Sequence, residues 1–142
     1  MSVIYTDGSC LSNPDGPSGW AVVLIENNQE YIFCDGVESS TNNRMELTAV
    51  IEGLKHAGYR NCTVYSDSQL TINCATNVWR RRANLDLWNE YDTASKDKDI
   101  KFIWVKAHAG DKYNEMVDKY AKLEAKKLKE KKNINKYKNV TL

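Results

Sequence analysis

Four carboxylates occupy positions in the sequence where they could act in catalysis or bind a metal ion: Asp7, Glu46, Asp67 and Asp118. The first and third each follow an apolar, β-branched run that ends in Tyr, a hydroxyl residue and Asp, in IYTDGS and VYSDS. Glu46 lies near the start of a predicted helix, on the edge of its apolar stripe, and Asp118 lies one turn into another. A strand that closes on a buried Asp carries a desolvation cost, so its recurrence sixty residues later needs a chemical reason.

Divalent cations supply such a reason, because converging carboxylates otherwise repel one another and raise one another's pKa values. If the two Asp-bearing strands are parallel neighbours, both carboxylates emerge at the same end of the sheet, where α/β proteins tend to place ligands. Oxygen ligands without clustered Cys or His suit Mg²⁺ or Mn²⁺. Two such ions about 3.5–4 Å apart form the clamp used for phosphodiester hydrolysis. Taken singly, each acid could be a turn former, a helix-dipole partner or a solvated residue, so the interpretation rests on all four.

The elements that must position these acids follow from hydrophobic periodicity. Period-two runs predict strands over residues 2–7, 19–25, 30–34, 62–66 and 100–105, with an Asn-Asn hairpin turn between the second and third. Helical spacing predicts helices from Thr41 or Asn42 to about Gly58, and over 68–75, 85–94 and 113–131, followed by a loosely ordered tail. A strand meander followed by alternating strands and helices is typical of an α/β fold with a mixed sheet flanked by helices.

Composition fits one soluble domain over residues 1–142, with 42% hydrophobic and 27% charged residues. No apolar run approaches membrane-spanning length, and the start lacks a signal peptide pattern, so no membrane association is expected. Four cysteines without a C-x-x-C pair are compatible with reduced thiols and a cytoplasmic location. Nine lysines against two glutamates between 119 and 138 give a local charge of +7 in a chain of net charge +1. This basic end suggests either a polyanion partner or a solvated helix and tail.

Five segments tie the acids together: YTDGSC, SNP, TNNRMEL, YSDSQ and WVKAHAG with the NE and D that follow. In this order they resemble the motif set of type 1 ribonuclease H, as in bacterial ribonuclease HI, from about residue 3 to residue 125. The resemblance implies a ribonuclease H-like fold with a five-stranded mixed sheet. It implies that the four carboxylates are catalytic and hold two Mg²⁺ ions, with Mn²⁺ able to substitute. The implied activity is endonucleolytic cleavage of the RNA strand of an RNA/DNA hybrid, leaving 5′-phosphate and 3′-hydroxyl ends.

The resemblance also implies roles for residues outside the acidic set. His108, in the loop KAHAGDK, corresponds to a mobile histidine that shuttles protons or helps product leave, which suits an imidazole titrating near neutrality; taken alone, it would be a solvated loop residue. Contacts to the nucleic acid are implied for residues in the matched segments: Cys10, Asn13, Thr41, Asn42, Asn43 and Gln69. Asparagines at a helix start are also helix caps, and both roles can coexist.

The chain departs from the family pattern in three places. The loop NPDGPSG replaces a tighter Gly-Pro-Gly arrangement, and Ala107 replaces a Gly before His108. Residues 76–87 are too short for the long basic protrusion of some bacterial relatives. We expect Trp79, Arg80 and Arg81 to contact the hybrid instead, with a core role for Trp79 as the alternative and the lysine-rich end from about residue 126 as electrostatic compensation.

Three functional hypotheses follow for the chain. The first is a free-standing, monomeric, metal-dependent ribonuclease H. The second is a non-catalytic hybrid- or duplex-binding module of the same fold, which usually loses one or more of the acids that are all present here. The third is the nuclease domain of a reverse-transcriptase-type protein, left open by the missing protrusion. Cleavage of a hybrid, abolished by substitution of one Asp, would separate the first from the second.

Overall fold

The sheet holds five strands in the order β3-β2-β1-β4-β5 in this computed structural model, which describes the backbone of residues 1–140 and the side chains of residues 1–131. The strands are β1 (Ser2–Cys10), β2 (Ser18–Glu26), β3 (Gln29–Val37), β4 (Asn61–Ser66) and β5 (Asp99–Trp104). β1, β2 and β3 form an antiparallel meander, whereas β4 runs parallel to both β1 and β5. The predicted α/β fold with a five-stranded mixed sheet is therefore confirmed.

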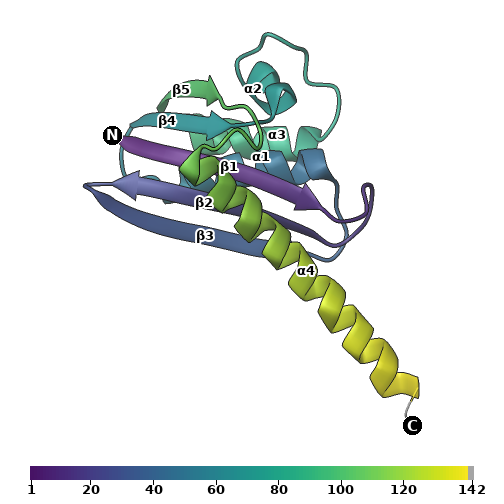
Figure 1. The fold of residues 1–142 in the computed structure, drawn as a ribbon. Helices are drawn as coiled ribbons and strands as arrows, with labels where there is room; N and C mark the ends of the chain where they lie inside the picture. Colours follow the sequence, from purple (N-terminus) through teal and green to yellow (C-terminus); the bar gives the residue numbers. More distant parts are fainter. Residues whose placement is uncertain (141–142) are drawn as a thin grey trace.

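The helices cover the two faces of the sheet. They are α1 (Asn42–His56), α2 (Gln69–Ala75), α3 (Leu85–Ser95) and α4 (Lys112–Val140). α1 packs on one face, where Ile4, Val22 and Leu54 belong to the larger core, and α3 packs against α1. α4 crosses the other face over β1, β2 and β3, with Val117 and Ala121 buried against the sheet, and then projects past β3 (Figure 1).

Local chemistry explains where several elements begin and turn. Asn27 and Asn28 adopt positive φ angles of 53° and 64°, as a tight turn between twisted strands requires. The Thr41 side chain accepts a hydrogen bond from the Arg44 N–H at 3.2 Å and caps α1. Ser68 caps α2 in the same way, also at 3.2 Å. The predicted hairpin and the predicted Thr41 cap are confirmed.

Several predicted boundaries are wrong, among them the end of β3, which runs to Val37 instead of residue 34. β1 does not close on Asp7, because antiparallel pairing with β2 continues from Asp7↔Ala21 to Cys10↔Ser18. α4 does not end near Lys131 but runs to Val140, so the loosely ordered tail is replaced by helix up to that residue; residues 141–142 lie outside the described part of the chain. Lysine and glutamate are good helix formers, which favours this extension.

Two glycines let the helices approach the sheet closely. A Cβ placed on Gly8 of β1 would lie 2.4 Å from the backbone N of Glu46, so α1 lies directly against the strand there. A Cβ on Gly19 of β2 would lie 2.2 Å from the carbonyl oxygen of Ala121, so α4 is equally close on the other face. Side chains at these positions would push the helices outward.

The longest helix, α4, is rich in lysine throughout its length. Within the described part of the chain, no helix is both long enough and apolar enough to cross a membrane.

Candidate functional site

Asp7 and Asp67 occupy equivalent positions on neighbouring parallel strands. Tyr5 and Tyr65 are the last residues paired between β1 and β4, and their rings stack with centroids 4.4 Å apart. Each aspartate comes two residues after its tyrosine, so Asp7 shares the face of Tyr5 because side chains alternate along a strand. β4 ends at Ser66 while β1 continues. Asp67 therefore leaves the sheet beside Asp7, as the parallel-neighbour hypothesis required.

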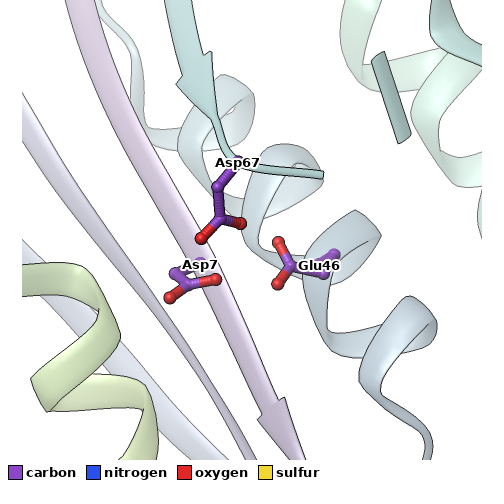
Figure 2. A group of neighbouring side chains, drawn as sticks. All are labelled: Asp7, Glu46 and Asp67. Carbon is purple, nitrogen blue, oxygen red and sulfur yellow. The ribbon is translucent and has the colours of Figure 1, made fainter. Parts of the chain in front are cut away.

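Glu46 completes a group of three carboxylates. It projects from the second turn of α1, which Gly8 holds close to β1. One oxygen from each of Asp7, Glu46 and Asp67 can be chosen so that all lie within 4.8 Å of one another. Figure 2 shows the three side chains pointing toward one another from β1, α1 and the end of β4. Three separate elements thus converge on one small volume.

Burial gives this group unusual electrostatics. Glu46 is 4% exposed, and burial together with the charge of Asp7 holds the pKa of Glu46 well above its usual range. Burial is also the main cause that raises the pKa of Asp7 to about 7, although a hydrogen bond from the Gly8 N–H at 2.9 Å opposes it. Burial and the charge of Asp118 raise the pKa of Asp67. In the absence of a cation, the group resists full ionisation.

The donor set fits a divalent cation. Glu46 Oε2 is buried and has no hydrogen-bond partner among the described residues. A buried carboxylate oxygen left unpaired is costly, and a hard cation would satisfy it together with the neighbouring oxygens. The three oxygen donors therefore form a candidate site for a metal ion such as Mg²⁺.

Asp118 flanks this group from α4. It is not one of the three clustered acids, and its Oδ2 accepts a hydrogen bond from Lys122 Nζ at 3.0 Å. Its charge adds to the effect of burial in raising the pKa of both Asp7 and Asp67, so it acts on the cluster electrostatically. The predicted role of Asp118 as a fourth metal ligand stays a prediction.

His108 lies in the exposed loop between β5 and α4. It adopts a positive φ of 55°, and Gly110 follows with a φ of 88°. Burial is the main cause that raises the pKa of Asp67, and the neighbouring His108 acts in the opposite direction. An exposed imidazole in this position is suited to proton transfer.

Hydrogen bonds connect the end of β1 and its following loop to the start of α1, so the predicted substrate residues of these two segments lie close together. Asn13 Oδ1 accepts a hydrogen bond from the backbone N–H of Asn42 at 3.2 Å. The Cys10 thiol donates to the carbonyl oxygen of Ser40 at 3.5 Å, next to the Thr41 cap. The structure therefore brings Cys10, Asn13, Thr41 and Asn42 to one side of the sheet.

The remaining two amides predicted to contact the nucleic acid lie at helix starts. Asn43 is exposed in the first turn of α1, and Gln69 is exposed as the first residue of α2. α2 packs against α1, and Gln69 follows Asp67 by only two residues. Both amides are therefore free to meet a ligand that approaches the clustered acids.

The residues of the short basic connection between α2 and α3 differ in what they contact. Trp79 is 47% exposed, so the alternative core role is not supported. Arg80 lines a cavity of about 210 Å³ together with side chains of the three neighbouring helices, including Asn43, Leu70 and Trp88. Arg80 and the predicted substrate residue Asn43 therefore line the same cavity.

Arg81 is instead engaged within the protein. Its Nη1 pairs with Asp92 Oδ1 at 2.8 Å, and its Nε donates to the carbonyl oxygen of Cys74 at 3.1 Å. The guanidinium also lies 4.3 Å from the ring centroid of Trp88. These contacts tie the connection to α2 and α3, and the predicted contact of Arg81 with substrate stays a prediction.

One residue beside the site was missed by sequence reasoning. The indole Nε1 of Trp104, at the end of β5, donates a hydrogen bond to the backbone carbonyl of Asp67 at 3.2 Å. Its position at the start of the WVKAHAG segment was the available signal, but the contact depends on the parallel pairing Ser66↔Trp104. Trp104 therefore holds the backbone of a clustered acid.

The sheet order and the buried carboxylate cluster together define a ribonuclease H-like fold with an acidic candidate metal centre. A family model described as RNase H matches residues 1–126. Ribonuclease H of Helicobacter acinonychis is 44% identical over 135 residues, covering 87% of this chain and 92% of the relative. The chain belongs to the ribonuclease H family, whose members are enzymes that hydrolyse RNA in hybrids.

Solved structures agree with the fold. The N-terminal RNase H domain of a Mycobacterium tuberculosis protein superimposes with a TM-score of 0.82 at 22% identity, covering 92% of this chain and 96% of that one. LC11-RNase H1, solved in complex with an RNA/DNA hybrid, superimposes with a TM-score of 0.76 at 18% identity, covering 89% of this chain and 98% of that one. At these identities the likeness concerns the fold.

Proposed function

We propose that this ribonuclease H cleaves the RNA strand of RNA/DNA hybrids endonucleolytically, leaving 5′-phosphate and 3′-hydroxyl ends. The observation that carries the proposal is the convergence of Asp7, Glu46 and Asp67, with a buried Glu46 oxygen that has no protein partner among the described residues. The hybrid bound to LC11-RNase H1, a protein of the same fold, supports this class of substrate.

The carboxylates would hold two Mg²⁺ ions, with Mn²⁺ able to substitute and Asp118 contributing from α4. When bound, these ions supply an activated water and neutralise charge that develops on the scissile phosphate. Asp7 and Glu46, held by β1 and α1, fix the buried side of the site, while Asp67 borders the His108 loop. The His108 imidazole moves a proton between the site and solvent or assists departure of the product.

Recognition of the hybrid would fall to the surface around the start of α1. The amides of Asn13, Asn42 and Asn43 both donate and accept hydrogen bonds, which suits contacts to sugars and phosphates. Contacts to the 2′-hydroxyl in the shallow minor groove distinguish RNA from DNA. The residues that would border this surface or contact the second strand are Cys10, Thr41, Gln69, Trp79, Arg80 and Arg81.

Cleavage of a labelled hybrid tests the proposal. Purified protein with Mg²⁺ should cut a uniformly labelled RNA/DNA hybrid, and Asp67→Asn should lower the rate by roughly 10²–10³-fold or more, because a metal-binding charge is lost. The matched control is Asp35→Asn on β3, whose exposed carboxylate accepts a hydrogen bond from the Gly36 N–H and lies outside the cluster. An intact hybrid with wild-type protein would refute the proposal, and binding without cleavage would favour the non-catalytic module.

The proposal also includes a cytoplasmic, monomeric enzyme. All four cysteines are free thiols, which suits a reducing compartment. Light scattering of the purified protein at several concentrations tests the monomer: a mass near 16.2 kDa is expected, and a mass that rises with concentration would contradict it.

A further inference from the structure

The described lysines of α4 are not spread evenly around the helix. Lys119, Lys122, Lys126 and Lys129 follow one another at intervals of three and four residues. At about 100° per residue, they fall within an arc of about 80° on one flank of α4. We call these four residues the lysine flank.

The lysine flank begins at the carboxylate site. Lys122 Nζ lies 3.0 Å from Asp118 Oδ2, so the first residues of the flank adjoin the acid whose charge acts on the cluster. Lys119, Lys126 and Lys129 are exposed and form no ion pair among the described residues. Three of the four charges are therefore available to a partner.

The contacts of the opposite flank show which way the lysines face. Tyr113 donates a hydrogen bond to Glu30, and the Cys34 thiol donates to Glu124 at 3.4 Å. Glu30 is the second residue of β3, next to the turn between β2 and β3, and Cys34 lies four residues further along the strand. The lysine flank is therefore turned toward the other end of the meander, where β1 leads into its loop.

That end of the meander carries the proposed substrate surface. The loop after β1 contains Asn13, whose side chain accepts a hydrogen bond from the backbone N–H of Asn42 at the start of α1. A hybrid that lies on this surface with a phosphate at Asp7 and Asp67 would extend alongside the lysine flank. Figure 1 shows α4 running from the middle of β1 outward past β3, so the flank leads away from the site.

We propose that the lysine flank binds phosphates of the RNA/DNA hybrid beyond the cleavage site. This binding would replace part of the hybrid binding that a basic protrusion provides in some bacterial relatives. The inference rests on the proposed function. The eleven residues from Lys119 to Lys129 span ten steps, a rise of about 15 Å along the helix. This length matches the rise of about four nucleotides of one strand, at about 3.4 Å each. The positive charges of the flank complement the negative phosphates of a nucleic acid backbone, which is the partner that we assign to it.

Two double variants on the same helix test the proposal at equal charge. Lys126→Gln with Lys129→Gln removes two charges from the flank, and Lys127→Gln with Lys131→Gln removes two from another side of α4, about a third to a half of a turn away. Hybrid binding is measured at several salt concentrations in an Asp67→Asn background, where cleavage is suppressed. The flank variant should bind a long hybrid roughly tenfold more weakly and reduce the salt slope by about two, because each phosphate contact contributes about one. The control variant should keep a hybrid affinity and a salt slope close to those of the Asp67→Asn parent protein.

The outcomes separate this proposal from the proposed function. If the protein with Asp67 intact cleaves the hybrid but the two double variants share one affinity and one salt slope, the lysine flank is refuted while the function stands. If it does not cleave, the function itself fails. Vesicles of anionic lipid are the comparison probe: loss of vesicle binding in the flank variant, with hybrid binding unchanged, would assign the flank to a membrane surface and overturn the proposal.

Discussion

The indole N–H of Trp104 donates to the backbone carbonyl of Asp67 across a distance of 3.2 Å. Asp67 lies just beyond the end of β4, where the ladder no longer restrains it. The neighbouring backbone is also held, because the Val105 N–H donates to the carbonyl oxygen of Ser66 at 3.0 Å. The end of β5 therefore positions a clustered acid without contributing a carboxylate.

Trp104→Phe should weaken cation binding more than hybrid binding. The substitution keeps an aromatic ring but removes the N–H, so the backbone of Asp67 loses a restraint. We expect the Mg²⁺ concentration for half-maximal activity to rise roughly tenfold, as for other residues that support metal ligands, with little change in KM for the hybrid. The control is Trp79→Phe on the exposed connection, which should leave the Mg²⁺ dependence unchanged. An unchanged Mg²⁺ requirement in Trp104→Phe would contradict the positioning role.

The metal-free protein should lose stability as pH rises from about 4 to about 7. The pKa of Asp7 is raised from 3.8 to about 7, mainly by burial, so the folded state holds its proton more tightly than the unfolded state does. The resulting penalty is absent below the unfolded pKa and complete above the folded pKa, and it is on the order of 2–4 kcal/mol. Thermal unfolding in EDTA should show a falling Tm over this range, and Mg²⁺ should restore stability at pH 8.

Asp7→Asn isolates the contribution of this carboxyl to the pH dependence. The Tm of the variant in EDTA should fall less steeply with pH than that of the wild type, because the neutral amide removes one repelling group. Asp35→Asn, outside the cluster, should keep the wild-type slope. Equal slopes in all three proteins would rule out a proton-linked penalty at Asp7.

Gly8→Ala should destabilise the protein and impair catalysis together. Its Cβ would lie 2.4 Å from backbone atoms of Met45 and Glu46, which cannot yield as a flexible side chain can. The strain should lower the free energy of unfolding by roughly 2–3 kcal/mol and move Glu46 away from Asp7. Denaturant titration and hybrid cleavage measure the two effects. In the control Gly58→Ala, the nearest atom is a Glu26 carboxylate oxygen 3.3 Å away, so a smaller loss is expected.

Arg80 and Arg81 should differ in how much they contribute to stability. Arg81→Ala removes the contacts to Asp92, Cys74 and Trp88 and should cost roughly 1–3 kcal/mol of stability. Arg80→Ala should leave Tm unchanged and raise KM for the hybrid, because Arg80 is exposed beside the cavity. Thermal unfolding and steady-state kinetics on both variants check this. Equal Tm losses would show that the two arginines do not differ in this way.

Local patterns in the sequence are sufficient for most of the fold. Alternation and helical spacing predict all five strands and four helices, since both depend on neighbouring residues. The Asn27–Asn28 turn and the Thr41 cap are equally local, because each is formed by residues a few positions apart. The extension of β1 past Asp7 cannot be read from such patterns, because β1 continues for as long as it pairs with β2. The paired residues, from Asp7↔Ala21 to Cys10↔Ser18, are 8 to 14 positions apart in the sequence.

For the site, the sequence by itself determined which residue types were present and in what order. It identified four acids whose convergence would suit divalent cations, and the resemblance to a motif set implied that these acids are catalytic and hold two metal ions. Only the tertiary structure decided which of the acids converge, that Arg81 is engaged internally, and that Trp104 holds Asp67. The reason is physical: burial and distance between residues far apart in the chain depend on register and packing, which no local stretch of sequence carries.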